Sequence, residues 1–201
     1  MATLYLTDIT KLPEDISPLL PLLSDSRRRR LEDLVGEKTR KRCLASGLLL
    51  RQVLGSDEVT LSAFGKPSLV DGSPFSLSHS GDYVLLAVAS RPVGVDIEMH
   101  RPLPFLALAT RFFAPSERTS VDSSPAFFDL WTAKESLAKM LGVGLALSMR
   151  RYALIKCESG YLCPGLPDVA LATLPELPGY SITLCCEEAH DGVLTQLDFG
   201  S

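Results

Sequence analysis

The stretch from Phe127 to Leu141 constrains the fold most, because its apolar residues recur at helical spacing. In a helix, Lys134 lies at the centre of an apolar stripe formed by Phe127, Leu130, Leu137, Ala138 and Leu141, with Trp131 at its edge. Glu135 and Lys139 lie on the shoulder of this stripe. A lysine in such a position either meets an anion or packs its stem along the core with its ammonium in water. The helix therefore predicts a substantial core with one unusual lysine.

The rest of the first half alternates between helical and strand patterns. The chain predicts a strand over residues 3–8 and helical periodicity over 26–53, interrupted near Gly36 and ended at Gly55. Residues 75–80 and 83–90 predict a hairpin that turns at Gly81-Asp82, and residues 93–99 a further strand.

The second half repeats this order of helices followed by hairpins. Helices are predicted over 106–113 and 127–141, and hairpins from the paired runs 152–156 with 161–163 and 181–187 with 193–199. Residues 100–104 indicate a connector and 119–125 an exposed loop. The prediction is an α+β fold of two similar halves, residues 1–94 and 95–201, with the site at their interface.

Composition excludes several classes of protein. No apolar run of the 201 residues is long enough to span a bilayer, and no secretory signal is evident, so we expect a cytoplasmic protein without membrane contact. Five cysteines without zinc-ligand spacing indicate reduced, mostly buried thiols.

The formal net charge of −4 hides a basic cluster in the first half. Nine of the 20 basic residues lie between Arg27 and Arg51, against three acidic ones. The cluster is too local and too poor in aromatic residues to indicate nucleic-acid binding. It is typical of a solvated helix face, of a phosphate site or of a surface for an acidic protein.

Carboxylates gather in the segment Gly94-Val95-Asp96-Ile97-Glu98. In a strand Asp96 and Glu98 share one face, and Glu135 supplies a third carboxylate. Oxygen ligands favour magnesium over zinc, and Lys134 and Lys139 would neutralise phosphate charge beside them. The alternative for the acidic pair is the polar outer face of an edge strand.

The segment Phe75-Ser76-Leu77-Ser78-His79-Ser80-Gly81 ends a strand in a turn. Ser78, His79 and nearby amides are suited to binding an anion, although an exposed histidine beside a turn is the simpler interpretation. The chain has no Gly-x-Ser-x-Gly elbow, Walker loop or Gly-x-Gly-x-x-Gly fingerprint, which argues against a hydrolase triad and against the common nucleotide-binding folds.

These segments together resemble the 4′-phosphopantetheinyl transferases, specifically the surfactin-synthetase-activating type with two pseudo-symmetric halves. The similarity covers about residues 65 to 140. It is carried, in order, by Gly65-Lys66-Pro67, residues 75–81, residues 94–98, Arg111-Phe112-Phe113 with Glu117, and Trp131-Thr132-Ala133-Lys134-Glu135-Ser136 with Lys139.

The resemblance implies transfer of the phosphopantetheine arm of coenzyme A to a serine of an apo acyl or peptidyl carrier protein, with release of adenosine 3′,5′-bisphosphate. It implies that Asp96, Glu98 and Glu135 hold Mg²⁺, that Glu135 takes the serine proton directly or through a water, and that Asp96 and Lys139 share in catalysis. The coenzyme A contacts that it implies are Arg27, Arg30, Arg42, Lys66, Ser78, His79, Lys134 and Lys139.

The protein is expected to act as a monomer. Two other hypotheses remain: a non-catalytic relative that binds coenzyme A or a carrier protein, and an unrelated magnesium-dependent phosphohydrolase. The first would bind coenzyme A without consuming it, and the second would cleave it without any carrier protein.

Overall fold

The computed structural model describes residues 1–70, 72–143, 149–174, 177–187 and 190–200. The helical segments are η1 (Ile9–Lys11), η2 (Ser17–Leu22), α1 (Asp25–Asp33), α2 (Glu37–Leu54), α3 (Phe105–Phe112), α4 (Pro115–Arg118) and α5 (Ser124–Leu141). The strands are β1 (Ala2–Asp8), β2 (Thr60–Leu61), β3 (Pro67–Ser68), β4 (Phe75–Ser80), β5 (Tyr83–Val88), β6 (Val93–Met99), β7 (Ile155–Cys157), β8 (Gly160–Leu162), β9 (Ala170–Thr173), β10 (Tyr180–Cys186) and β11 (His190–Gln196).

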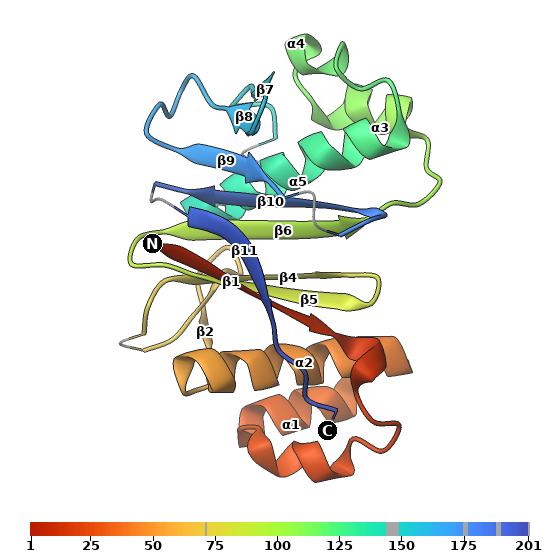
Figure 1. Ribbon diagram of the computed structural model, residues 1–201, viewed down its shortest axis with the longest axis vertical. Helices are drawn as coiled ribbons and strands as arrows, with labels where there is room; N and C mark the ends of the chain where they lie inside the picture. Colours follow the sequence, from red (N-terminus) through yellow and green to blue (C-terminus); the bar gives the residue numbers. More distant parts are fainter. Residues whose placement is uncertain (71, 144–148, 175–176, 188–189, 201) are drawn as a thin grey trace.

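Two sheets lie between two long helices, as Figure 1 shows. The first sheet has the order β11-β1-β5-β4 and the second has the order β6-β10-β9-β8-β7. Helix α2 covers the outer face of the first sheet, and α5 covers the outer face of the second (Figure 1). The predicted α+β class is confirmed, whereas the pseudo-twofold relation of the halves and their boundary at residue 94 stay predictions.

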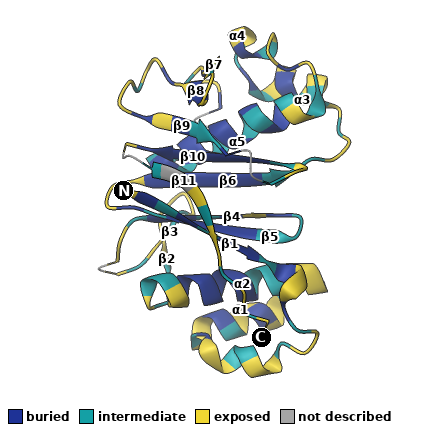
Figure 2. Ribbon diagram, in the orientation of Figure 1, coloured by how far each residue is buried: buried dark blue, intermediate teal, exposed yellow. Residues whose placement is uncertain are grey.

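Strand alternation divides the interior into three apolar layers. In β5, Leu85 faces β6 and β10 in the layer between the sheets, whereas Leu86 packs on the α2 side. In β10, Leu184 joins the layer between the sheets and Cys185 packs against α5. Figure 2 accordingly shows the strands at the centre of the molecule as mostly buried. The two-sided burial explains why these strands are nearly continuous apolar runs.

The predicted interruption at Gly36 and stop at Gly55 are confirmed by the caps of α2, whereas α5 starts at Ser124, before the predicted residue 127. Gly36 precedes α2 with a φ of 91°, and Gly55 ends it with a φ of 79°, a region that glycine enters readily. Helix α5 starts where the Ser123 hydroxyl accepts the Ala126 N–H (3.3 Å). The predicted loop over 119–125 is therefore shorter than expected, and Val121 within it is buried.

One predicted hairpin is wrong. Residues 181–187 and 193–199 do not pair with each other, because β10 is already hydrogen-bonded to β6 on one side and to β9 on the other. Strand β11 instead runs parallel to β1 and completes the first sheet. The hairpins at Gly81-Asp82 and between β7 and β8 are confirmed.

Gly94 brings the second sheet close to its helix. A Cβ atom at this position would lie 1.9 Å from the carbonyl oxygen of Ser136 and 2.5 Å from the backbone nitrogen of Met140. Only glycine allows β6 to approach α5 so closely. This approach places the carboxylates of β6, Asp96 and Glu98, beside Glu135 of α5. Among the described helices, none is both long and apolar enough to cross a membrane.

Candidate active site

The two sheets meet where β4 runs beside β6, a contact that we call the β4–β6 seam. Serine hydroxyls of β4 accept hydrogen bonds from backbone N–H groups of β6, pairing Ser76 with Val95 (3.0 Å), Ser78 with Ile97 (3.3 Å) and Ser80 with Met99 (3.0 Å). Alternate serines thus satisfy alternate amides, and they place β4 against the acidic face of β6.

Asp96 lies at this seam and is 4% exposed. Its Oδ1 accepts hydrogen bonds from Ser78 Oγ (2.6 Å) and from Lys139 Nζ (2.6 Å). Its Oδ2 is buried and has no hydrogen-bond partner among the described residues. Burial raises the pKa of Asp96, and the Lys139 ammonium opposes this rise. An unpartnered buried carboxylate oxygen is costly unless a ligand completes it.

Glu98 is anchored in a similar way. Its Oε2 accepts hydrogen bonds from Ser80 Oγ (2.8 Å) and from Arg101 (3.1 Å), and neither contact engages Oε1. Asp96 and Glu98 therefore share one face of β6, as their spacing predicted, while Val95 and Ile97 pack in the layer between the sheets.

Glu135 and Lys139 reach this region from α5. Burial raises the pKa of Glu135 to about 7, and the nearby Asp96 and Glu98 carboxylates act in the same direction. Lys139 Nζ donates to the carbonyl oxygen of Val95 (3.1 Å) as well as to Asp96. Asp96 and Glu98 thus oppose the ionisation of Glu135, and a cluster of carboxylates of this kind favours a bound cation.

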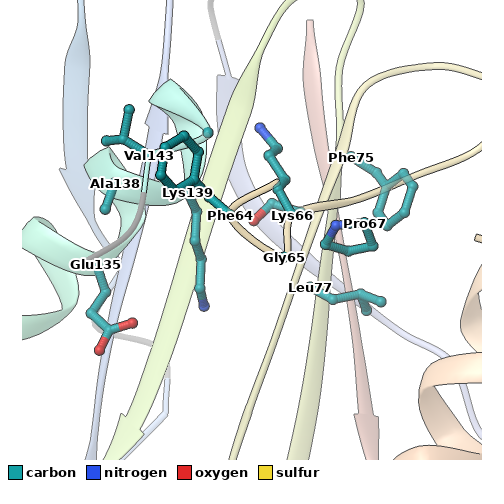
Figure 3. A pocket seen from close by; sticks show the side chains of 12 residues that line it. Phe64, Gly65, Lys66, Pro67, Phe75, Leu77, Glu135, Ala138, Lys139 and Val143 are labelled. Carbon is teal, nitrogen blue, oxygen red and sulfur yellow. The ribbon is translucent and has the colours of Figure 1, made fainter. Parts of the chain in front are cut away.

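An open cleft of about 470 Å³ exposes this cluster. Asp96, Glu98, Glu135 and Lys139 line it together with Arg27, Arg30 and His79. Burial lowers the pKa of His79, and the nearby Arg42 and Lys139 charges act in the same direction. A second cavity of about 280 Å³ continues from it along the loop that carries Phe64 and Lys66. Figure 3 shows Glu135 and Ala138 on the α5 side of this cavity, with Lys66, Pro67 and Leu77 on its other side.

The residues present fit a divalent cation, although their coordination geometry is not preformed. In the described part of the chain, no three histidine, cysteine or acidic side chains converge as metal ligands. The Lys139 ammonium neutralises Asp96 instead. The unpartnered Asp96 Oδ2 and the three mutually repelling carboxylates form an oxygen-only donor set, which suits Mg²⁺ if substrate phosphates and waters complete its shell.

Without a divalent cation, the stability of the protein is expected to fall as pH rises from about 4.5 to about 7. The pKa of Glu135 is raised from 4.5 to about 7 in the folded state, so the folded protein holds the proton more tightly than the unfolded chain. The resulting stabilisation is complete below pH 4.5 and is lost as pH rises through about 7. Urea unfolding in EDTA between pH 5 and 8 measures this decline.

The Glu135→Gln variant is the control for this dependence. Glutamine does not titrate, so the decline should be shallower, although the raised pKa of Asp96 preserves part of it. A decline as steep in the variant as in the wild type would contradict the assignment to Glu135.

Most of the predicted phosphate-binding side chains lie around the cleft. Arg27, Arg30, Ser78 and His79 line it, and Lys66 lines the adjoining cavity. Arg27 is buried and faces Asp57 at 3.9 Å, whereas Arg30 is exposed. Lys66 Nζ donates to the carbonyl oxygens of Val93 and Met140 (both 3.3 Å).

Arg42 is not among the residues that line the two cavities. Its guanidinium donates from Nε (3.0 Å) and from a second nitrogen to the carbonyl oxygen of Gly81, so it supports the turn of the β4–β5 hairpin. A contact between Arg42 and coenzyme A remains a prediction, and it would require the guanidinium to leave this carbonyl.

Lys134 is not among the residues that line the two cavities, and its role as a phosphate ligand stays a prediction. It is 1% exposed, and its Nζ lies 2.5 Å from Glu117 Oε1. Nζ also donates to the carbonyl oxygens of Met149 (3.0 Å) and Tyr152. Of the two alternatives that the sequence leaves open for this lysine, an anion or solvent, the structure shows an anion, Glu117.

Two residues to which the sequence patterns assign no role contact the predicted groups in the structure. Ser80 contacts Glu98, and Glu117 receives Lys134. The period-two serines of β4 carried a signal for the first, because three hydroxyls on one strand face require polar partners. No local pattern indicated the second, since Glu117 lies 17 positions from Lys134 in the chain.

Comparison with known proteins identifies relatives along most of the chain. Residues 92–184 match the family model of the 4′-phosphopantetheinyl transferase superfamily. The chain is 31% identical over 192 residues to 4′-phosphopantetheinyl transferase psf-1 of Bacillus pumilus, covering 86% of this chain and 82% of the relative. It is 28% identical over 192 residues to 4′-phosphopantetheinyl transferase Sfp of Bacillus subtilis (strain 168), covering 86% and 85%.

A more distant relative comes from a vertebrate. The L-aminoadipate-semialdehyde dehydrogenase-phosphopantetheinyl transferase of Xenopus laevis is 32% identical over 154 residues, covering 62% of this chain and 51% of the relative.

Proposed function

The chain belongs to the 4′-phosphopantetheinyl transferase superfamily, and we propose that it transfers the phosphopantetheine arm of coenzyme A to a serine of an apo acyl or peptidyl carrier protein. The observation that carries the proposal is the convergence of Asp96, Glu98, Glu135 and Lys139 in one cleft beside basic side chains. Such a cleft binds a pyrophosphate and stabilises the charge that develops when it is cleaved.

In this proposal Asp96, Glu98 and Glu135 hold Mg²⁺, which neutralises pyrophosphate charge when bound. Arg27, Arg30 and His79 bind the phosphates in the cleft, and Lys139 exchanges Asp96 for a phosphate oxygen. The cavity beside Phe64 and Lys66 accommodates another part of coenzyme A.

The reaction joins the carrier serine oxygen to the phosphorus that bears the pantetheine arm. The bond from that phosphorus to the bridging oxygen breaks, and adenosine 3′,5′-bisphosphate leaves with the bonding electrons. Glu135 accepts the serine proton, directly or through one water, since a carboxylate placed beside the attacking hydroxyl can act as a general base. Lys139 stabilises the negative charge of the leaving phosphate.

The proposed carrier partner is acidic. Helices α1 and α2 border the cleft through Arg27, Arg30 and Ser46, and they expose Arg29, Lys38 and Arg40 nearby in the sequence. Positive charge beside an active site attracts an acidic partner and accelerates its encounter.

We propose that the protein acts as a monomer in the cytoplasm, without nucleic-acid or membrane partners. All five cysteines are free thiols, which agrees with a reducing compartment.

Chromatography of a reaction with coenzyme A, Mg²⁺ and apo carrier protein tests the reaction type. Adenosine 3′,5′-bisphosphate is expected to appear in step with the carrier consumed and to be absent in EDTA. Release without carrier would instead indicate a hydrolase. Binding of coenzyme A without release, with both acyl and peptidyl carriers, would indicate a non-catalytic binding protein.

A further inference from the structure

The hydroxyl of Ser80 makes two hydrogen bonds, one with the backbone of β6 and one with the Glu98 carboxylate. Its oxygen accepts the backbone N–H of Met99 (3.0 Å), and its proton is donated to Glu98 Oε2 (2.8 Å). A serine hydroxyl has one proton and two acceptor sites. With the amide in place, the proton is directed toward the carboxylate, so the backbone of β6 sets the orientation of this hydrogen bond.

Ser80 is the buried anchor of Glu98. The second contact of the carboxylate comes from Arg101, whose side chain is 51% exposed. An ion pair with a long, exposed side chain fixes the orientation of its partner only weakly. Ser80 is 9% exposed and lies within a strand, so its position is fixed by the sheet. Ser78 makes the same paired contacts with Ile97 and Asp96.

We propose that Ser80 is a positioning residue that holds the Glu98 carboxylate in the orientation required to bind a divalent cation in the cleft. This inference rests on the proposed function in taking Glu98 as a cation ligand. Removing a group that orients a ligating side chain typically weakens metal binding by about 10- to 100-fold.

Ser76 provides a matched control on the same strand. Its hydroxyl accepts the N–H of Val95 (3.0 Å), which is the equivalent contact across the β4–β6 seam. Within the described part of the chain, no carboxylate contacts Ser76. Replacing either serine by alanine removes one seam hydrogen bond, but only Ser80→Ala releases a carboxylate.

Calorimetric titration of Mg²⁺ into the protein with coenzyme A tests the proposal without any carrier protein. Ser80→Ala is expected to weaken Mg²⁺ binding by about tenfold. Ser76→Ala, measured at saturating coenzyme A because Ser76 lines the adjoining cavity, is expected to weaken it much less. In a Glu98→Ala background, adding Ser80→Ala should cause no further weakening, because Ser80 acts through Glu98. Thermal unfolding confirms that each variant is folded.

The proposal would be overturned if the two serine variants weakened Mg²⁺ binding equally, or if Ser80→Ala bound Mg²⁺ with wild-type affinity. It would also be overturned if Ser80→Ala weakened Mg²⁺ binding as much in the Glu98→Ala background as in the wild type. If Ser80→Ala does not fold, Ser80→Cys keeps the side-chain volume with a weaker donor and should weaken binding in the same direction. A wild-type protein that binds no Mg²⁺ with coenzyme A would also overturn it. The transfer proposed above is assayed separately with a carrier, so the two failures are distinguishable.

Discussion

Replacing Asp96 by asparagine is expected to reduce transfer by about 10³-fold while leaving the protein folded. Asparagine preserves the shape of the side chain and can still accept from Ser78, but it removes the charge on which cation binding and the Lys139 contact depend. Burial raises the pKa of Asp96, so its charged form is costly in the folded state. The variant should therefore unfold at the same temperature as the wild type or higher.

Initial rates of carrier modification and thermal unfolding together measure this effect. Asp198→Asn is the matched control, because Asp198 also pairs with a lysine, Lys11 at 2.9 Å, but on the exposed surface. The control should retain normal rates. Near-normal turnover in Asp96→Asn would refute the role assigned to the acidic cluster.

Replacing Lys134 by alanine is expected to lower the free energy of unfolding by about 3–5 kcal/mol. The change leaves the Glu117 carboxylate buried without its cation and removes the donor for the carbonyl oxygens of Met149 and Tyr152. Glu117 still accepts the backbone N–H groups of Ala114 and Leu154 (both 2.7 Å), so the loss centres on the ion pair.

Urea unfolding measures the loss, and Lys156→Ala is its control because Lys156 is exposed on β7. That variant should unfold within about 0.5 kcal/mol of the wild type. If Lys134→Ala kept full stability but bound coenzyme A weakly, Lys134 would be a phosphate ligand after all, and its burial against Glu117 would not explain its presence.

Local sequence patterns were sufficient to predict most of the helices and strands. Helix α5 and strand β6 follow from periodicity, and the ends of α2 follow from two glycines. The pairing of β11 with β1 was not predictable, because it joins strands more than 180 positions apart and competes with a plausible local hairpin. Local sequence patterns do not show which edge of a strand is already hydrogen-bonded to another strand.

The candidate site, like the fold, could be predicted only in part from local sequence patterns. The shared face of Asp96 and Glu98 follows from the two-residue period of a strand, and the structure places Glu135 and Lys139 beside it. The helical wheel leaves open whether Lys134 meets an anion or reaches solvent, since an apolar stripe gives the direction of a side chain and not its partner. A phosphate and a buried glutamate would both neutralise such a lysine.

Intact-protein mass spectrometry of an apo carrier protein, after incubation with this protein, coenzyme A and Mg²⁺, shows whether the phosphopantetheine arm is transferred. The carrier is expected to gain the mass of one arm. The gain should disappear with EDTA, with Asp96→Asn, or when the acceptor serine of the carrier is replaced by alanine. An unchanged carrier mass across acyl and peptidyl carriers, despite measurable binding of coenzyme A, would contradict the proposed transfer.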